Sequence, residues 1–353
     1  MRAFLLTRLV AAGAIVVSCA AGTAAFTPAA IAQTAVADVI VPPAPKPAVP
    51  KPTPAKQLFG SKDRPADLKP RAIGFYSRGC LAGGQALPID GPAWQAMRLS
   101  RNRNWGHPNL IKLIERLATD AKREDDWPGL LVGDLTQPRG GPMLSGHASH
   151  QIGLDADIWL TPMPDRRLSW AERETTSAVS MLADTLSVDP KVFTTKHVKL
   201  IQRAASYPEV ERIGVNPAIK LALCRAEGGD KPWLQKIQGW PGHHYHMHIR
   251  IKCPENSDGC TGQGPPTHTS CAHAEKWYRD TKAWLEQPKK PKPKTEAKKP
   301  SKPKPEVTLT DLPNACEDVL AAASAGSPKN QIEHVLAPAR KPVSRAAAVS
   351  PTR

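Results

Sequence analysis

The sequence predicts an α+β domain in which a small antiparallel sheet is flanked by helices and held by disulfides. Strand-like and helix-like segments alternate irregularly, without a repeating βαβ pattern, which favours an antiparallel sheet. Six of the seven cysteines remain when Cys19, near the N-terminus, is left out, and an even number in an exported chain predicts disulfides rather than free thiols. The compact part of the chain, residues 71–286, is long enough for a single hydrophobic core.

Residues 1–32 are predicted to be a signal peptide. Arg2 and Arg8 supply a positive start, residues 9–18 are apolar, and residues 30–32 read Ala-Ile-Ala, as at a cleavage site. The apolar run is too short to cross a bilayer, so we expect an exported, periplasmic protein with no integral membrane segment after signal removal. The residues before Cys19 also resemble a bacterial lipoprotein cleavage site, so anchoring through Cys19 stays open.

The formal net charge of +16 lies largely in two Pro/Lys-rich stretches, which we interpret as linkers at 33–70 and 287–306. Such runs bury little surface and favour an extended, solvated chain. They are either spacers or sites of electrostatic attachment to an anionic wall or membrane surface. A nucleic acid partner is not expected, because no binding motif is recognisable. Residues 307–353 form a C-terminal tail.

The first predicted elements lie before and at the end of a histidine-rich stretch. Asn109 or Pro108 begins a helix whose apolar residues recur at helical spacing up to Leu117. Residues 130–134 read as a buried strand that leads to a Gly-Gly turn, and residues 155–160 read as a second strand.

The later elements surround a second histidine-rich stretch. Further helices are predicted at 169–187, 193–205, 216–224 and 277–285, and short strands at 211–215 and 244–251.

The two histidine-rich stretches predict one metal site. Residues 145–157 read SGHASHQIGLDAD and residues 243–248 read HHYHMH. Neutral imidazole and carboxylate are the usual zinc donors outside thiolate sites. The chain has no C-x-x-C pair and no H-E-x-x-H, which argues against a thiolate site and a thermolysin-type site. We therefore expect the small sheet to carry a Zn²⁺ site.

Strand geometry narrows the candidate ligands without choosing among them. His246 and His248 lie on one face of the predicted strand, so both can approach one ion. Asp155 and Asp157 likewise share a face, and either can be a ligand. A coordination position left to water would make the site catalytic rather than structural.

Simpler explanations exist for each residue alone. His107 and His197 fit helix starts or surface positions, His147 fits a turn, and Asp155 fits a hydrogen-bond acceptor. The concentration of six of the eleven histidines in two short stretches favours the metal site over these explanations.

Several motifs of the sequence resemble those of a known family. The residues G-H-A-S-H-Q-x-G-L-D-x-D at 146–157, N-P-A-I-K at 216–220 and H-x-x-H-M-H at 243–248 closely resemble penicillin-insensitive murein endopeptidases. That family belongs to a zinc peptidase group with lysostaphin-type enzymes, D-Ala-D-Ala peptidases and hedgehog domains. The resemblance covers residues 70–285 and Cys316. It implies β-lactam-insensitive hydrolysis of D-Ala–meso-diaminopimelate cross-links in peptidoglycan.

The resemblance also implies roles for single residues. His150, Asp157 and His248 correspond to the zinc ligands, which makes His246 a base or transition-state stabiliser and His243 a further active-site residue.

Two further positions concern additional metal contacts. His147 resembles an additional metal-contacting position, and Asp184 matches another. The histidine partner expected near Asp184 is replaced by Ser187, which leaves a second metal open. Spacing alone allows fifteen pairings of the six cysteines other than Cys19. The family pattern implies the disulfides Cys80–Cys316, Cys224–Cys271 and Cys253–Cys260.

Three functions remain to be separated. The first is a zinc endopeptidase of peptidoglycan. The second is a D-Ala-D-Ala carboxypeptidase, which differs from it mainly in how open the cleft is. The third is a non-catalytic, zinc-stabilised wall-binding module. The oligomeric state is open, with a homodimer as one expectation.

Overall fold

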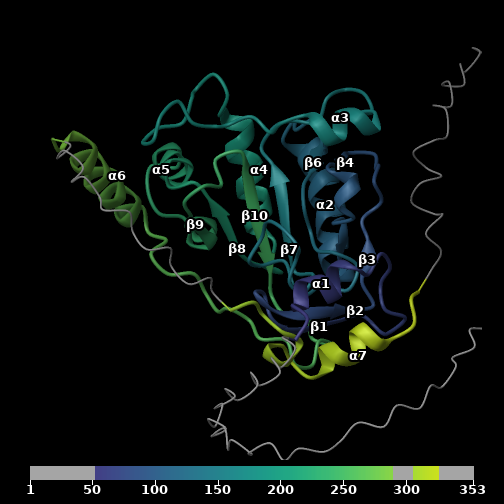
Figure 1. The fold of residues 1–353 in the computed structure, drawn as a ribbon. Coiled ribbons are helices and arrows are strands. Elements are labelled where there is room, and N and C mark those ends of the chain that lie inside the picture. The colour runs from purple at the N-terminus through teal and green to yellow at the C-terminus, as the bar shows by residue number, and fades with distance from the viewer. Residues whose placement is uncertain (1–51, 289–304, 326–353) are drawn as a thin grey trace, which may run out of the picture. The chain divides into compact units, whose positions relative to one another are not determined.

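The main sheet contains six strands and runs through the centre of the molecule (Figure 1). The structure is a computed structural model that describes residues 52–288 and 305–325. In spatial order the strands are β4 (Trp94–Ala96), β6 (Leu130–Val132), β7 (Asp155–Trp159), β10 (His246–Ile251), β8 (Val210–Val215) and β9 (Ile237–Gly239). The predicted signal peptide and the lipidation position lie outside the described residues.

The four inner strands are antiparallel, whereas the two outer pairs, β4–β6 and β8–β9, are parallel. The prediction of an α+β fold is confirmed, but that of a wholly antiparallel sheet is wrong at both edges. The reason is that the chain forms helix α2 (Pro108–Glu124) after β4 and before β6. It likewise forms helix α5 (Pro217–Ala226) after β8 and before β9. A helical crossover returns the chain to the same end of the sheet, which makes the next strand parallel.

The remaining helices and strands lie outside the main sheet. They are the helices α1 (Ala55–Gly60), α3 (Trp170–Thr175), α4 (Thr195–Ser206), α6 (Cys271–Glu286) and α7 (Ala315–Ala321), and the two-stranded sheets β1 (Arg71–Phe75) with β2 (Arg78–Ala82) and β3 (Gln85–Ala86) with β5 (Trp105–Gly106). Among the described helices, none has both the length and the apolarity needed to cross a bilayer.

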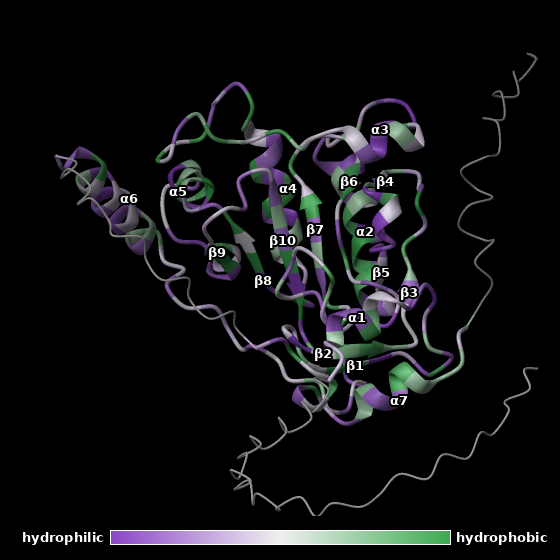
Figure 2. Cartoon of the chain, viewed as in Figure 1, coloured by the Kyte–Doolittle hydropathy of each residue, from purple (hydrophilic) through white to green (hydrophobic). Residues whose placement is uncertain are grey.

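The core lies between one face of the main sheet and the helices α2, α4 and α5. Ile158 of β7 and Met247 and Ile249 of β10 are fully buried there, against apolar residues of α2 such as Leu117. The apolar faces of α2 and β7 are visible as hydrophobic segments in Figure 2. Side chains alternate along a strand, so the residues between these core positions face the other side of the sheet.

The helix predicted at 169–187 is wrong after its first two turns, since α3 ends at Thr175. In the segment that follows, the Asp184 carboxylate accepts hydrogen bonds from the backbone N–H groups of Leu186 and Ser187. Such side-chain bonds offer the backbone an alternative to helix and favour a turn. Helix α2 begins at Pro108, one of its two predicted starts, and His107 is its N-cap. Its Nδ1 accepts from the Asn109 N–H.

The two terminal segments form a second, smaller core. Phe59 of α1 and Val319 of α7 are fully buried beside the Cys80–Cys316 disulfide. The folded part therefore begins before residue 71, and the expected linker at 33–70 extends too far. The C-terminal segment packs against β2, as Figure 1 shows for α7.

Arg139 fastens this C-terminal segment from within. Its side chain is buried and donates to the carbonyl oxygens of Val319, Leu320 and Ala322, and to Ser324 Oγ. Carbonyls at a helix C-terminus have no partners inside the helix, so a guanidinium satisfies several of them at once.

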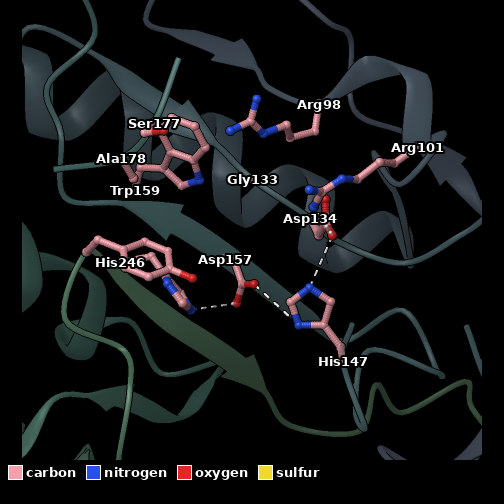
Figure 3. A pocket seen from close by; sticks show the side chains of 11 residues that line it. Arg98, Arg101, Gly133, Asp134, His147, Asp157, Trp159, Ser177, Ala178 and His246 are labelled. Atoms are coloured by element: carbon pink, nitrogen blue, oxygen red, sulfur yellow. Dashed lines mark hydrogen bonds and ion pairs between the residues drawn. The ribbon is translucent and has the colours of Figure 1, made fainter. Parts of the chain in front are cut away.

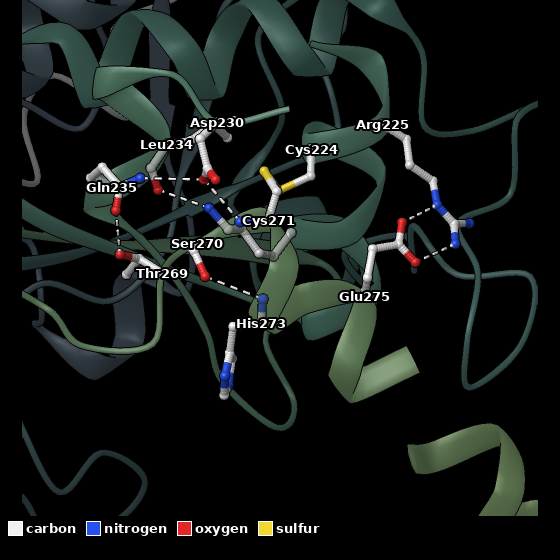
Figure 4. Close-up of a disulfide and its surroundings, with 11 residues drawn as sticks. Cys224, Arg225, Asp230, Leu234, Gln235, Thr269, Ser270, Cys271, His273 and Glu275 are labelled. Carbon is white, nitrogen blue, oxygen red and sulfur yellow. Dashed lines mark hydrogen bonds and ion pairs between the residues drawn. A yellow bond between two sulfur atoms is a disulfide. The ribbon is translucent and has the colours of Figure 1, made fainter. Parts of the chain in front are cut away.

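Two other disulfides complete the cysteine pairing that the resemblance implies. Cys253–Cys260 closes a short loop, and Cys224–Cys271 joins the end of α5 to the first residue of α6. Figure 4 shows this second bridge beside the Arg225–Glu275 ion pair, which connects the same two helices.

Removal of the Cys80–Cys316 bridge should be the most destabilising cysteine change. The bridge spans 236 residues and restricts the unfolded chain much more than Cys253–Cys260, which spans 7. Chain-entropy estimates give losses of about 5.5 and about 2.4 kcal/mol in the free energy of unfolding. Urea unfolding of Cys80→Ala/Cys316→Ala against Cys253→Ala/Cys260→Ala tests the difference. Equal losses would contradict it.

Candidate metal centre

The pairing of β7 with β10 creates the floor of the site. His248 lies directly opposite Asp157, and His246 lies opposite Trp159. The alternating neighbours Ile158 and Met247 point into the core. Asp157, His246 and His248 are therefore on the same, opposite face of the sheet.

The loop that precedes β7 adds His147 and His150. His150 has a left-handed backbone with φ 66°, which is unusual for a residue other than glycine. Its N–H donates to Asp155 Oδ2 at 3.0 Å, which holds the turn in place. Three residues later the backbone requires a glycine. Gly153 has φ 73°, and a Cβ there would lie 2.7 Å from Leu81 Cδ2. Such a strained backbone, kept by its surroundings, is common at functional sites.

Donor atoms from both stretches converge on Asp157. Its Oδ1 lies 3.4 Å from His150 Nε2 and 3.1 Å from His248 Nδ1, and its Oδ2 lies 3.6 Å from His147 Nδ1. Donor atoms of His147, His150 and Asp157 all lie within 4.8 Å of one another. Figure 3 shows His147 and Asp157 side by side at the cavity, joined by a dashed line.

The donor atoms fit a metal ion. His150 Nδ1 and Nε2 and Asp157 Oδ1 are buried and have no hydrogen-bond partner among the described residues, and His248 Nδ1 lies 3.1 Å from Asp157 Oδ1. A buried polar atom without a partner costs about 1–3 kcal/mol. Several such atoms on one small group are explained if they serve as ligands. Imidazole and carboxylate donors suit Zn²⁺.

The protonation states also suit a cation. Burial lowers the pKa of His150, which keeps the ring neutral. Burial raises the pKa of Asp157, but the neighbouring His150 and His248 outweigh it and hold the pKa well below the usual range. Burial lowers the pKa of His248, but Asp155 and Asp157 raise it to about 9. The two carboxylates that attract this proton would also attract a metal ion, which can bind the ring only after the proton has left.

Asp155 is held by neighbouring groups on both of its carboxylate oxygens. Its Oδ1 accepts from Arg250 Nε at 2.6 Å and lies 3.2 Å from His248 Nε2, and its Oδ2 accepts from Arg250 Nη2 and the His150 N–H. Both oxygens are thus engaged, whereas Asp157 Oδ1 is not. The geometry therefore favours Asp157 over Asp155 as a ligand, a choice that strand alternation alone leaves open.

His246 and His243 lie beside the group. His246 Nε2 is 3.6 Å from Asp157 Oδ1, and its ring centroid is 4.9 Å from that of His243. Burial lowers the pKa of His246 to about 4 and also lowers that of His243. Both rings are therefore neutral near pH 7 and can accept a proton.

Sequence reasoning missed Asp134 as a site residue. Its buried carboxylate accepts from Arg101 and Arg103 at 3.0 and 2.9 Å, and its Oδ2 lies 3.1 Å from His147 Nε2. A carboxylate that holds the second nitrogen of a candidate ligand orients that ring. In the sequence, the sign of this role was that Asp134 is a charged residue directly after a buried apolar strand.

Asp184 is not brought into this group. It is exposed, and its carboxylate is engaged by the turn at 184–187. Within residues 52–288 and 305–325, only His147, His150 and Asp157 form a group of three or more residues placed to hold a metal. A second metal at Asp184 stays a prediction. His107 and His197 cap α2 and α4, in agreement with the simpler explanation of each.

Three cavities meet at His147. One of about 320 Å³ reaches Arg98 and Trp159, and one of about 420 Å³ reaches Trp240 and His243. A third, of about 300 Å³, extends toward Lys56 and the C-terminal segment. The metal group therefore faces a cleft that continues in several directions.

Comparison with known proteins gives the family. The family model described as "Penicillin-insensitive murein endopeptidase" matches residues 72–321. The chain belongs to this family. A penicillin-insensitive murein endopeptidase of Haemophilus influenzae is 44% identical over 226 residues, which cover 63% of this chain and 76% of the relative. The protein of that name from Pectobacterium atrosepticum is 40% identical over 232 residues, 65% of this chain and 82% of the relative. The family expected from the motifs is thus confirmed.

The Asp134 cluster should make stability depend on pH in acid. Burial raises the pKa of Asp134, but His147, Arg101 and Arg103 outweigh it and lower the pKa from 3.8 to about 2. The resulting stabilisation is present above about pH 4 and is lost as the pH falls through the folded-state pKa. Asp134→Asn should therefore lower the free energy of unfolding by about 2 kcal/mol at pH 7 and by much less near pH 2.

Urea unfolding between pH 2 and pH 7 measures this difference. Asp280→Asn is the control, because Asp280 forms an exposed ion pair with Lys276 on α6. Its effect should stay under about 1 kcal/mol. An Asp134→Asn loss that is independent of pH would contradict the assignment.

Proposed function

We propose that this chain is an exported zinc endopeptidase that hydrolyses D-Ala–meso-diaminopimelate cross-links in peptidoglycan. Its family and its relatives' names support the reaction class. The observation that carries the proposal is the set of unsatisfied, buried donor atoms of His150 and Asp157, with His248 Nδ1 beside them, at the floor of an open cleft.

His150, Asp157 and His248 would hold the zinc, with His147 as an additional contact at the rim. When bound, zinc supplies a Lewis acid for the scissile carbonyl and acidifies a water molecule. The chain's own task is to place the substrate and to move protons. Asp155 would orient the His248 ring, and Asp134 would orient the His147 ring.

His246 is the residue best placed for proton transfer. Its Nδ1 is buried without a hydrogen-bond partner among the described residues, and its low pKa keeps it neutral. It can accept the proton of the attacking water and return it to the leaving amine nitrogen. His243, next to it, can support the charge that develops. No serine is acylated in this scheme, so β-lactams have no nucleophile to modify.

The cleft favours an endopeptidase over a carboxypeptidase. The cavities that meet at His147 continue past the metal group on more than one side, which leaves room for peptide on both sides of the scissile bond. A wall-binding module with structural zinc does not require neutral histidines beside the metal, since structural sites are closed by protein ligands. Location outside the cytoplasm follows from the substrate. Lipidation at Cys19 and a homodimer remain expectations.

Metal removal and ligand substitution test the proposal. Cross-linked muropeptide dimers should be cleaved to monomers by the full chain. A chelator should abolish the reaction, zinc should restore it, and benzylpenicillin should leave it unchanged. His248→Ala should lower kcat/KM at least about a thousandfold. Mass spectrometry of the products detects cleavage.

His268→Ala is the matched control for that variant. His268 is an exposed histidine that pairs with His273 outside the metal group, so its loss should leave the rate within about twofold. Full activity of His248→Ala would contradict the assignment of His248 as a metal ligand. Release of terminal D-Ala with intact dimers would instead support the carboxypeptidase.

The role of His246 can be separated from that of the ligands. His246→Ala should lower kcat by about 10²–10⁴ and leave bound zinc near one equivalent, because general acid–base catalysis contributes that much. Elemental analysis and single-turnover rates measure the two quantities. Loss of zinc along with activity would make His246 a ligand instead.

A further inference from the structure

Arg98 is a cation in the catalytic cleft that the proposed reaction does not yet use. It lines the same cavity of about 320 Å³ as Asp157 and His246. Figure 3 shows its side chain across the cavity from His147, on the side where Trp159 lies. Arg98 precedes the short helix Leu99–Arg101, on a different segment from every candidate metal ligand.

Arg98 differs from the two other arginines near this cavity in having no acidic partner. Arg101 and Arg103 both bind the Asp134 carboxylate. Among the described residues, Arg98 forms no ion pair, and its one side-chain hydrogen bond runs from Nη2 to the Thr176 carbonyl oxygen at 2.9 Å. Nε, Nη1 and the second hydrogen of Nη2 remain as donors, so one edge of the guanidinium still presents two parallel N–H groups. A guanidinium with a free pair of donors is suited to a carboxylate.

The surroundings hold Arg98 close to the reacting region. Its backbone has φ 56°, and its N–H donates to the Arg173 carbonyl oxygen. Its guanidinium carbon lies 5.7 Å from the centre of the Trp159 ring, and Trp159 pairs directly with His246 across the strands. The cation is thus one side chain away from the residue proposed to protonate the leaving nitrogen. A left-handed backbone conformation is strained for an arginine, and strain of this kind is concentrated at functional sites.

The chemistry of the proposed substrate identifies the group that Arg98 meets. In a D-Ala–diaminopimelate cross-link, the alanine on the acyl side has no charge near the scissile bond. The carbon attached to the leaving nitrogen carries a carboxylate, three bonds from the scissile carbonyl carbon. It is the anion nearest to the reacting atoms, and it lies on the side of the bond that His246 would protonate.

We propose that Arg98 binds this carboxylate and makes the enzyme selective for substrates in which it is free. The inference rests on the proposed function. Arg98 is then a specificity-determining residue that acts through the leaving half of the substrate. Amidation of the same carboxylate would remove the charge and leave the scissile bond unchanged. The enzyme should therefore distinguish amidated from non-amidated cross-links.

The test compares two muropeptide dimers that differ only at this carboxylate, which is free in one and amidated in the other. The wild-type chain, loaded with zinc, should cleave the free acid with a kcat/KM at least about tenfold higher. Arg98→Gln should reduce the ratio to about one, by slowing the acid while leaving the amide within about twofold. Arg98→Lys should give an intermediate ratio, because it keeps the charge but not the paired donors.

The ratio within one preparation protects the test from partial misfolding, which slows both substrates equally. Arg116→Gln is the matched control, since Arg116 also lies over an aromatic ring, Tyr207, but on α2 outside the cleft. It should keep the wild-type ratio. A wild-type ratio near one, or an unchanged ratio in Arg98→Gln, would overturn the inference while the endopeptidase survives. Cleavage of neither dimer by the wild type would overturn both.

Discussion

The antiparallel register of β7 and β10 is the constraint on which the site depends. It sets His248 opposite Asp157 and directs both away from the apolar core. A shift of one residue in a strand exchanges its two faces. Such a shift would bury Asp157 among the core residues and expose Ile158 in the cleft. The apolar packing of alternate residues therefore holds the polar residues in position.

The polar face is itself buried, so its charges need fixed partners. Asp155 is fully buried and receives two hydrogen bonds from Arg250, whose guanidinium carbon lies 4.0 Å from the centre of the Tyr76 ring. A buried ion pair contributes little net stability, because both charges lose their hydration. Its contribution here is positional. It ties β7, β10 and the His150 turn to one point, and Asp157 is left with an oxygen free to bind a metal.

The terminal segments extend this arrangement to the edge of the cleft. The Cys80–Cys316 bridge and the buried Arg139 hold α7 against β2, and the Lys56–Glu306 ion pair joins the two segments near α1. Lys56 and Glu306 also line the cavity that reaches His147. The C-terminal segment, which follows the Lys/Pro-rich stretch, is therefore part of the wall of the site. This is why the folded domain is longer than the composition of residues 33–70 suggests.

The sequence by itself determined the family, the two halves of the candidate metal site and most elements around them. These are local properties: strand alternation puts His246 and His248 on one face, and the motifs hold His147, His150 and Asp157 within eleven residues. Only the tertiary structure decided which aspartate keeps a free oxygen, because that depends on Arg250, ninety-five residues from Asp155. It also revealed Asp134 and Arg98, whose roles arise from neighbours distant in the chain. The parallel edges of the sheet and the broken helix after Thr175 were missed for the same reason: crossover connections and competing side-chain bonds are not visible in the periodicity of a short segment.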